Sequence, residues 1–147
     1  MAGTILVRDV MTRNVKSVGT NQPLIEAIQL MYKFDIGSII VIQRAKPVGI
    51  ITDRDIIRNI ALSQLDPVNL KAKDLMSTPL ISIEENATIE EAAQIMVKKK
   101  IKRLPVVKEE KLVGIITVTD IAKTTPHLIK VFEDLMWNTI KPQKNAP

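Results

Sequence analysis

Hydrophobic and polar positions in the first half of the chain change their spacing in a regular order. A short apolar run is followed by a segment in which apolar residues such as Ile28 and Met31 recur at helical spacing, and then by two nearly continuous apolar runs. Continuous runs of this kind are typical of strands in a sheet that is covered on both faces. The predicted elements are a strand at 15–18, a helix at 24–34, strands at 39–42 and 48–52, and a helix from 53 onward.

The second half of the chain repeats this order. Residues 7–58 align without a gap on residues 72–123, and 19 of the 52 paired positions are identical. The chain is therefore an internal duplication of a β-α-β-β-α unit. In the second copy the predicted elements are a strand at 80–83, a helix at 89–100, strands at 104–107 and 112–117, and a helix from 118 onward.

A unit of about 55 residues buries too little surface to be stable by a wide margin on its own. We therefore expect an α/β fold in which the two tandem β-α-β-β-α repeats pack as one pseudo-twofold module around a shared core. The expected boundaries are 7–62 for repeat 1, 63–71 for a linker, 72–125 for repeat 2, and 126–147 for a C-terminal amphipathic helix and tail.

Composition narrows the possible chemistry. The 147 residues include no cysteine, so a disulfide framework, a thiolate metal site and a cysteine nucleophile are all excluded. His127 is the only histidine and has no partner for a metal site or a catalytic triad. We accordingly expect neither a metal site nor an enzyme. The first residues lack a basic segment followed by a long apolar run, which favours a cytoplasmic protein without a membrane anchor.

The most informative motif is Gly-x-x-Thr-x-x-Asp, which occurs at 49–55 and again at 114–120. In each copy it lies where an apolar strand runs into a helix. One interpretation is structural, because Thr at the N-cap and Asp at the third helical position form an acidic capping box. The other is a binding site, since the free N–H groups of a helix start attract phosphate. The sequence is compatible with both.

The duplication, these motifs, Asp9-Val10-Met11, Asp74-Leu75-Met76 and the segment 101–107 together resemble the cystathionine β-synthase (CBS) domain family. The resemblance covers about residues 7 to 124 and implies a stand-alone tandem CBS pair. It further implies a regulatory module that binds AMP, ADP, ATP or S-adenosylmethionine between the repeats, and an adenosine ligand of this kind would be regulatory and not a catalytic cofactor.

The resemblance also implies roles for individual residues. Carboxylates would accept ribose hydroxyls, threonines would lie near phosphate, backbone before the first strand of the opposite repeat would contact adenine, and a basic pair would face phosphate. The corresponding residues are Asp55 and Asp120; Thr52 and Thr117; Arg13, Asn14, Val15, Lys16, Thr78, Pro79, Leu80 and Ile81; and Lys102 and Arg103.

The basic pair has no counterpart in repeat 1, where Gly37 and Ser38 occupy the equivalent positions. We therefore expect the cleft of Thr117 and Asp120 to hold phosphate-bearing nucleotides, and the cleft of Thr52 and Asp55 to be weaker, empty or suited to a less anionic ligand.

Two other functions are compatible with the sequence. A net charge of +5 and the basic run at 98–103 would suit nucleic acid, although no aromatic residue interleaves with the lysines to stack bases. A structural dimerisation module with empty clefts is the second alternative. For the regulatory pair, apolar positions in the segment 128–136 and the resemblance to a family whose members pair favour a homodimer, and the regulatory role implies a protein that it regulates.

Overall fold

The computed structural model describes residues 3–124 and Glu133. The expected C-terminal helix and tail at 126–147 lie outside these residues, apart from Glu133. Along the chain the helices and strands are α1 (Val7–Val10), β1 (Ser17–Gly19), α2 (Leu24–Lys33), β2 (Ser38–Gln43), β3 (Lys46–Thr52), α3 (Asp53–Ile56), η1 (Ile57–Leu62), η2 (Pro67–Asn69), α4 (Ala72–Leu75), β4 (Ile83–Glu84), α5 (Ile89–Lys99), β5 (Arg103–Lys108), β6 (Lys111–Thr117) and α6 (Val118–Ala122).

Each repeat forms its own three-stranded sheet, in the order β1-β2-β3 and β4-β5-β6. The first strand of each sheet pairs parallel to the second, and the second pairs antiparallel to the third. The two hairpins turn through residues with positive φ, 55° and 66° at Arg44 and Ala45 and 51° and 68° at Glu109 and Glu110. A two-residue turn in which both central residues have positive φ has a backbone twist that matches the right-handed twist of the flanking strands. The predicted α/β class and strand order are confirmed.

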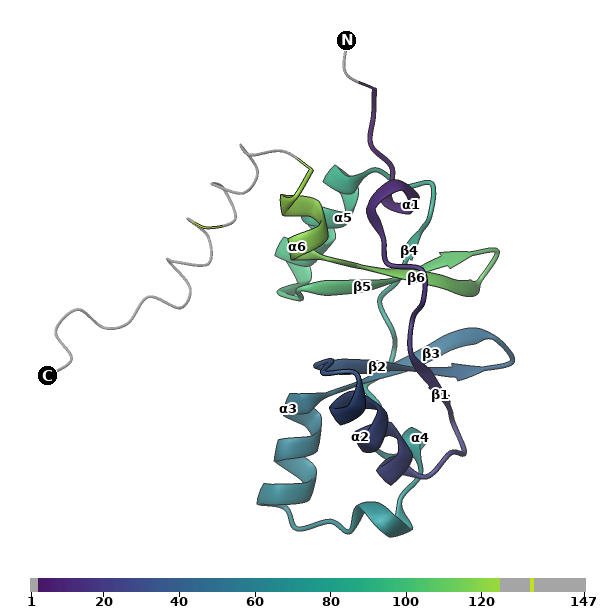
Figure 1. Ribbon diagram of the computed structural model, residues 1–147, viewed down its shortest axis with the longest axis vertical. Coiled ribbons are helices and arrows are strands. Elements are labelled where there is room, and N and C mark those ends of the chain that lie inside the picture. Colours follow the sequence, from purple (N-terminus) through teal and green to yellow (C-terminus); the bar gives the residue numbers. More distant parts are fainter. Residues whose placement is uncertain (1–2, 125–132, 134–147) are drawn as a thin grey trace, which may run out of the picture.

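The two sheets face each other in the middle of the molecule, and the helices lie on the outside (Figure 1). The helix α2 turns Leu24, Ala27 and Met31 into the interior, and α5 does the same with Ile89, Ala92 and Met96. This spacing of three and four residues is the helical period seen in the sequence. Among the described residues, no helix is long and apolar enough to cross a membrane.

The interior consists of two hydrophobic clusters, so the expectation of one shared core is wrong. Each cluster is completed by residues from the start of the other repeat. Val7 and Met11, at the start of repeat 1, are buried in the cluster of repeat 2. Ala72 and Leu75, at the start of repeat 2, are buried in the cluster of repeat 1. The exchange gives each small unit apolar surface that its own segment cannot supply.

The exchanged segments cross between the sheets, and each is hydrogen-bonded to the third strand of the opposite repeat. Thr12 and Ile115 exchange backbone hydrogen bonds of 2.9 Å in both directions. Ser77 N donates to Ile50 O at 2.8 Å, and Ile50 N donates to Ser77 O at 3.3 Å. The segments that lead into β1 and β4 are thereby fixed against the opposite repeat, where they form walls between the two sheets.

Candidate ligand cleft between the repeats

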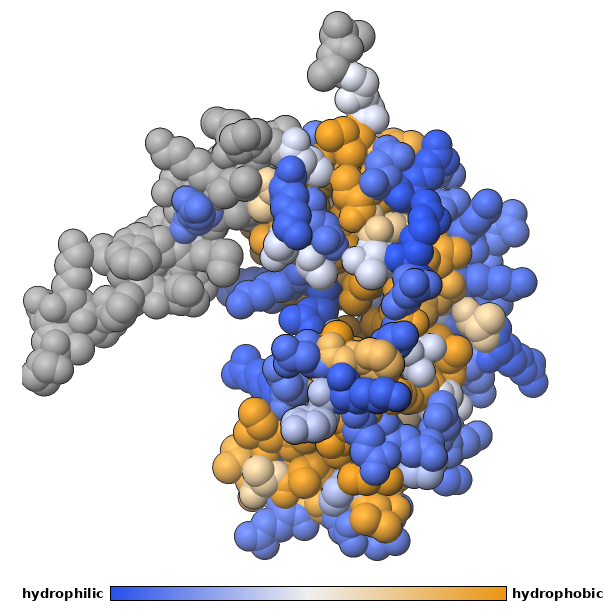
Figure 2. Space-filling view, in the orientation of Figure 1, coloured by the Kyte–Doolittle hydropathy of each residue, from blue (hydrophilic) through white to orange (hydrophobic). Residues whose placement is uncertain are grey.

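A cleft of about 420 Å³ lies between the repeats. Figure 2 shows the molecule hollowed between its two halves, with hydrophilic residues around the opening. Residues of both repeats line the cleft. They are Gly37, Ile50, Thr52, Asp53 and Arg54 from repeat 1, and Ser77, Pro79, Leu80, Ile81, Lys100, Ile101, Lys102, Arg103 and Pro105 from repeat 2.

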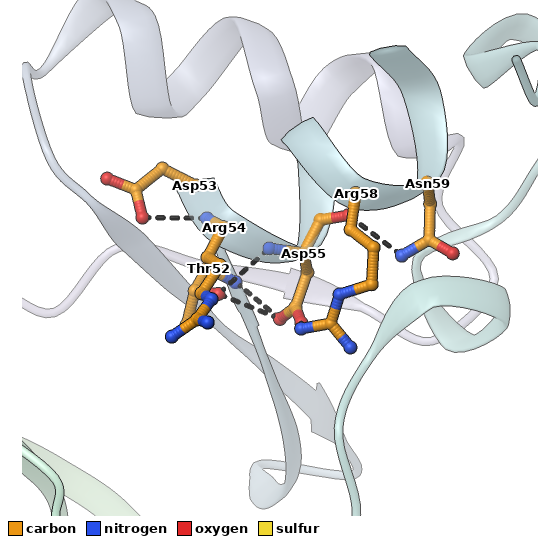
Figure 3. A network of polar contacts seen from close by, with 6 residues as sticks. All are labelled: Thr52, Asp53, Arg54, Asp55, Arg58 and Asn59. Carbon is orange, nitrogen blue, oxygen red and sulfur yellow. Dashed lines mark hydrogen bonds and ion pairs between the residues drawn. The ribbon is translucent and has the colours of Figure 1, made fainter. Parts of the chain in front are cut away.

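The turn between β3 and α3 supplies one wall of this cleft (Figure 3). Thr52 Oγ1 accepts from Asp55 N at 3.1 Å, while Thr52 N and Thr52 Oγ1 both donate to Asp55 Oδ2 at 2.9 Å. Asp55 is 8% exposed, and its Oδ1 lies 3.7 Å from Nη2 of Arg58. These bonds satisfy helix-start N–H groups that would otherwise lack partners. The capping interpretation of the motif is therefore confirmed in repeat 1.

Repeat 2 has the same arrangement at the start of α6. Thr117 N donates to Asp120 Oδ2 at 2.9 Å, and Asp120 N donates to Thr117 Oγ1 at 3.2 Å. Thr117, Asp120 and Asp55 do not line the 420 Å³ cleft, whereas Thr52 does. Ribose binding by the two aspartates and a phosphate role for Thr117 thus stay predictions.

Four positive side chains line the cleft, namely Arg54, Lys100, Lys102 and Arg103. Lys100 is brought there by the end of α5, where its left-handed backbone (φ 57°, ψ 44°) turns the chain toward β5. Asp53 is the only carboxylate among the described lining residues, so positive side chains outnumber negative ones. Low-dielectric walls that carry one predominant sign of charge attract ligands of the opposite sign.

The assignment of Lys102 and Arg103 to the cleft of Thr117 and Asp120 is corrected by this geometry. Both basic residues line the same cleft as Thr52. The two hairpins lie side by side with their turns at the same end, where Leu112 N donates to Ala45 O at 3.1 Å. At their other ends the start of β5 therefore lies beside the start of α3. The sequence alignment compares equivalent positions within the repeats, and it does not show which positions of different repeats face each other.

The segments expected to contact adenine divide between two places. Pro79, Leu80 and Ile81 line the 420 Å³ cleft, and Thr78 does not. Arg13 and Val15 line a second, smaller pocket of about 180 Å³, and Asn14 and Lys16 line neither pocket. The ammonium of Lys16 lies instead 4.3 Å from the ring centroid of Phe34.

Sequence reasoning did not single out Asp53, Arg54 or Lys100 as site residues. The sequence could have indicated Asp53 and Arg54, because residues directly after an N-cap threonine lie in the first helical turn, at the end of the helix where binding sites are expected. Lys100 carried no such signal, since a lysine at a helix C-terminus is usually explained by the helix dipole.

Metal ligands do not gather within residues 3–124 and Glu133, where no three histidine, cysteine, aspartate or glutamate side chains are placed to hold an ion. The described lining of the cleft combines apolar walls with four cationic side chains and one carboxylate.

The comparison with family models shows what class of protein this architecture represents. The CBS domain model matches residues 7–62 and again residues 72–127. The chain belongs to the CBS domain family, as a pair of tandem repeats.

Several relatives share both sequence and fold. The uncharacterized protein MK0525 of Methanopyrus kandleri is 36% identical over 126 residues, which cover 82% of this chain and 64% of that protein. This chain thus spans a little under two thirds of the length of MK0525. Hypoxic response protein 1 of Mycobacterium tuberculosis is 35% identical, with 85% of this chain and 89% of that protein covered.

Solved structures agree with these matches. A crystal structure of hypoxic response protein I with two coordinated zinc ions is 34% identical, with a TM-score of 0.75 over 82% of this chain and 99% of that one. The CBS domain pair of protein MJ0100, in complex with 5′-methylthioadenosine and S-adenosyl-L-methionine, is 27% identical, with a TM-score of 0.72 over 83% of this chain and 96% of that one.

Proposed function

We propose that this protein is a non-catalytic regulatory module that binds an adenosine-containing ligand in the cleft between its repeats. The observation that carries the proposal is the composition of the cleft. It combines apolar walls and four cations in a space of about 420 Å³, which is within the usual range for small-molecule sites.

Each part of the cleft suits one part of such a ligand. The apolar side chains of Ile50, Leu80 and Ile101 offer surfaces for a purine ring. The cations suit a phosphate or a carboxylate. A ribose would need hydroxyl acceptors, for which we propose Asp55 and, in a second cleft of repeat 2, Asp120. The complex of MJ0100 supports an adenosine ligand, and it leaves AMP, ADP, ATP and S-adenosylmethionine as candidates for this chain.

Binding would signal by changing the shape of the module or its affinity for a regulated protein. The cleft is bounded by Ser77 and Ile50, which hold an exchanged segment to the opposite sheet. A ligand seated there would contact both repeats, so its binding energy would act on their relative position.

A thermal-shift panel of AMP, ADP, ATP, adenosine and S-adenosylmethionine tests the proposal. A ligand that binds only the folded state adds about 2.7 kcal/mol at 100 times its Kd. At roughly 2–4 °C per kcal/mol, we expect at least one member of the panel to raise Tm by about 5 to 10 °C.

The same panel includes a single-stranded oligonucleotide and is run at low and high salt. An oligonucleotide that alone raises Tm, with an effect that falls steeply as salt increases, would indicate nucleic-acid binding instead. No shift with any adenosine compound, in a protein that melts cooperatively, would overturn the proposed function.

We also propose a homodimer. Large apolar side chains are exposed on η1 and on η2, which follows repeat 1, and Figure 2 shows hydrophobic residues gathered at the lower end of the molecule. Ile57 is 58% exposed, Leu62 75% and Val68 66%. A symmetric dimer would cover such surface with the same surface of a second copy.

For the dimer, we expect multi-angle light scattering to give twice the chain mass at micromolar concentration. Replacement of Ile57 and Leu62 by glutamate should lower the mass to that of a monomer, because charges would have to be buried at the contact. The matched control is Val97→Glu, which places a charge at an exposed apolar position of repeat 2. A wild-type protein that stays monomeric over all accessible concentrations would contradict the proposal.

A further inference from the structure

The single carboxylate in the cationic cleft, Asp53, is held in a defined position. Its Oδ1 accepts from Arg54 N at 2.8 Å, and its own N–H donates to Gly37 O at 2.9 Å. Figure 3 shows the bond from Arg54 at the start of α3. The backbone and one carboxylate oxygen are thus fixed to the turn, and Oδ2 is the oxygen that remains to face the cleft.

Asp53 Oδ2 and the guanidinium of Arg103 converge above Gly37. A Cβ built on Gly37 would lie 3.2 Å from Asp53 Oδ2, 3.4 Å from Arg103 Nη1 and 3.7 Å from Arg103 Nη2. The carboxylate comes from repeat 1 and the guanidinium from repeat 2. The absence of a side chain at Gly37 leaves room for both groups, which lie near each other without forming a direct ion pair.

The fold itself does not require an acid at this position. Val118 occupies the equivalent place in repeat 2, and its N–H donates to Lys102 O at 3.0 Å, just as Asp53 N donates to Gly37 O. Ser38 stands where repeat 2 has Arg103. The opposed carboxylate and guanidinium are therefore a feature of this one cleft and not of the repeat.

We propose that Asp53 sets the charge selectivity of the cleft by repelling the anionic group of a ligand that binds Arg103. This inference rests on the proposed ligand-binding function. A phosphate that binds Arg103 lies close to a second negative charge, and the repulsion weakens its binding. A neutral nucleoside has no such penalty. Asp53 thereby narrows the difference in affinity between charged and neutral ligands of the same cleft.

The test is Asp53→Asn, which keeps the shape of the side chain and an oxygen able to accept from Arg54 N. Isothermal titration calorimetry with AMP, adenosine and inorganic pyrophosphate is compared in the wild type and the variant. We expect AMP and pyrophosphate to bind about tenfold more tightly to the variant, with adenosine within about twofold of wild type. The gain should shrink at high salt, where exposed charges are screened.

Glu109→Gln is the matched control, because it removes one negative charge from the turn between β5 and β6, outside the cleft lining. It should leave all three affinities unchanged. Equal or weaker binding of AMP and pyrophosphate by Asp53→Asn would overturn the role of Asp53, as would an equal gain in the control. If neither AMP nor adenosine binds the wild type, the proposed function fails, while pyrophosphate still decides the role of Asp53. If pyrophosphate also binds neither protein, the inference is overturned as well.

Discussion

Replacement of Gly114 by alanine is expected to destabilise the protein by about 3 kcal/mol, because the added methyl group has no room. A Cβ at this position would lie 2.5 Å from Met11 Sδ and 2.9 Å from the backbone oxygen of Thr12. The sulfur of a methionine can move, but Thr12 O is fixed by its hydrogen bond from Ile115 N. Gly114 does not have a positive φ, so steric overlap and not backbone conformation decides the effect.

A fall in Tm of about 6 to 12 °C by differential scanning calorimetry would correspond to this loss. The reduced freedom of the unfolded chain on changing glycine to alanine works in the opposite direction, by only about 0.4–1 kcal/mol. Gly3→Ala is the matched control, because no atom lies within 4 Å of its Cβ. A Gly114→Ala protein that melts within about 1 °C of wild type would show that the crossing segment can shift freely, contrary to the packing described here.

Arg103→Ala is expected to weaken AMP binding by about 10- to 150-fold, from the loss of a hydrogen bond to a charged group worth roughly 1.5–3 kcal/mol. Adenosine has no phosphate and should lose much less. The remaining cations of the lining, Arg54, Lys100 and Lys102, would still attract phosphate, so the preference for AMP should fall without disappearing. The quantity to measure is the ratio of AMP to adenosine affinity, by isothermal titration calorimetry.

Lys111→Ala provides the control for this variant, since it removes a positive charge from an exposed position at the start of β6, outside the cleft. A crystal of the wild type soaked with AMP would locate the phosphate independently. The geometry requires it beside Thr52 and Arg103. An unchanged affinity ratio in Arg103→Ala, or AMP bound only beside Asp120, would contradict the assignment of the basic pair to this cleft.

Several features of the protein follow from the sequence alone. The duplication and the order of strands and helices could be predicted because they depend on local spacing, as in the helical recurrence of Leu24, Ala27 and Met31. The capping role of Thr52 and Asp55 is also local, since the two residues lie within one turn of each other. Hydrogen bonds between residues so close in the sequence are set by the backbone geometry that all helix starts share.

Only the tertiary structure decided which parts of different repeats meet. Val7 and Met11 pack in the core of the repeat that follows, and Arg103 reaches the cleft of Thr52 instead of that of Thr117. Neither fact has a signature in the spacing of residues, because both depend on how two similar units pack across a pseudo-twofold axis. The convergence of Asp53 and Arg103 above Gly37 is of the same kind. It exists because a carboxylate and a guanidinium from distant parts of the chain both lie beside a glycine that has no side chain to displace them.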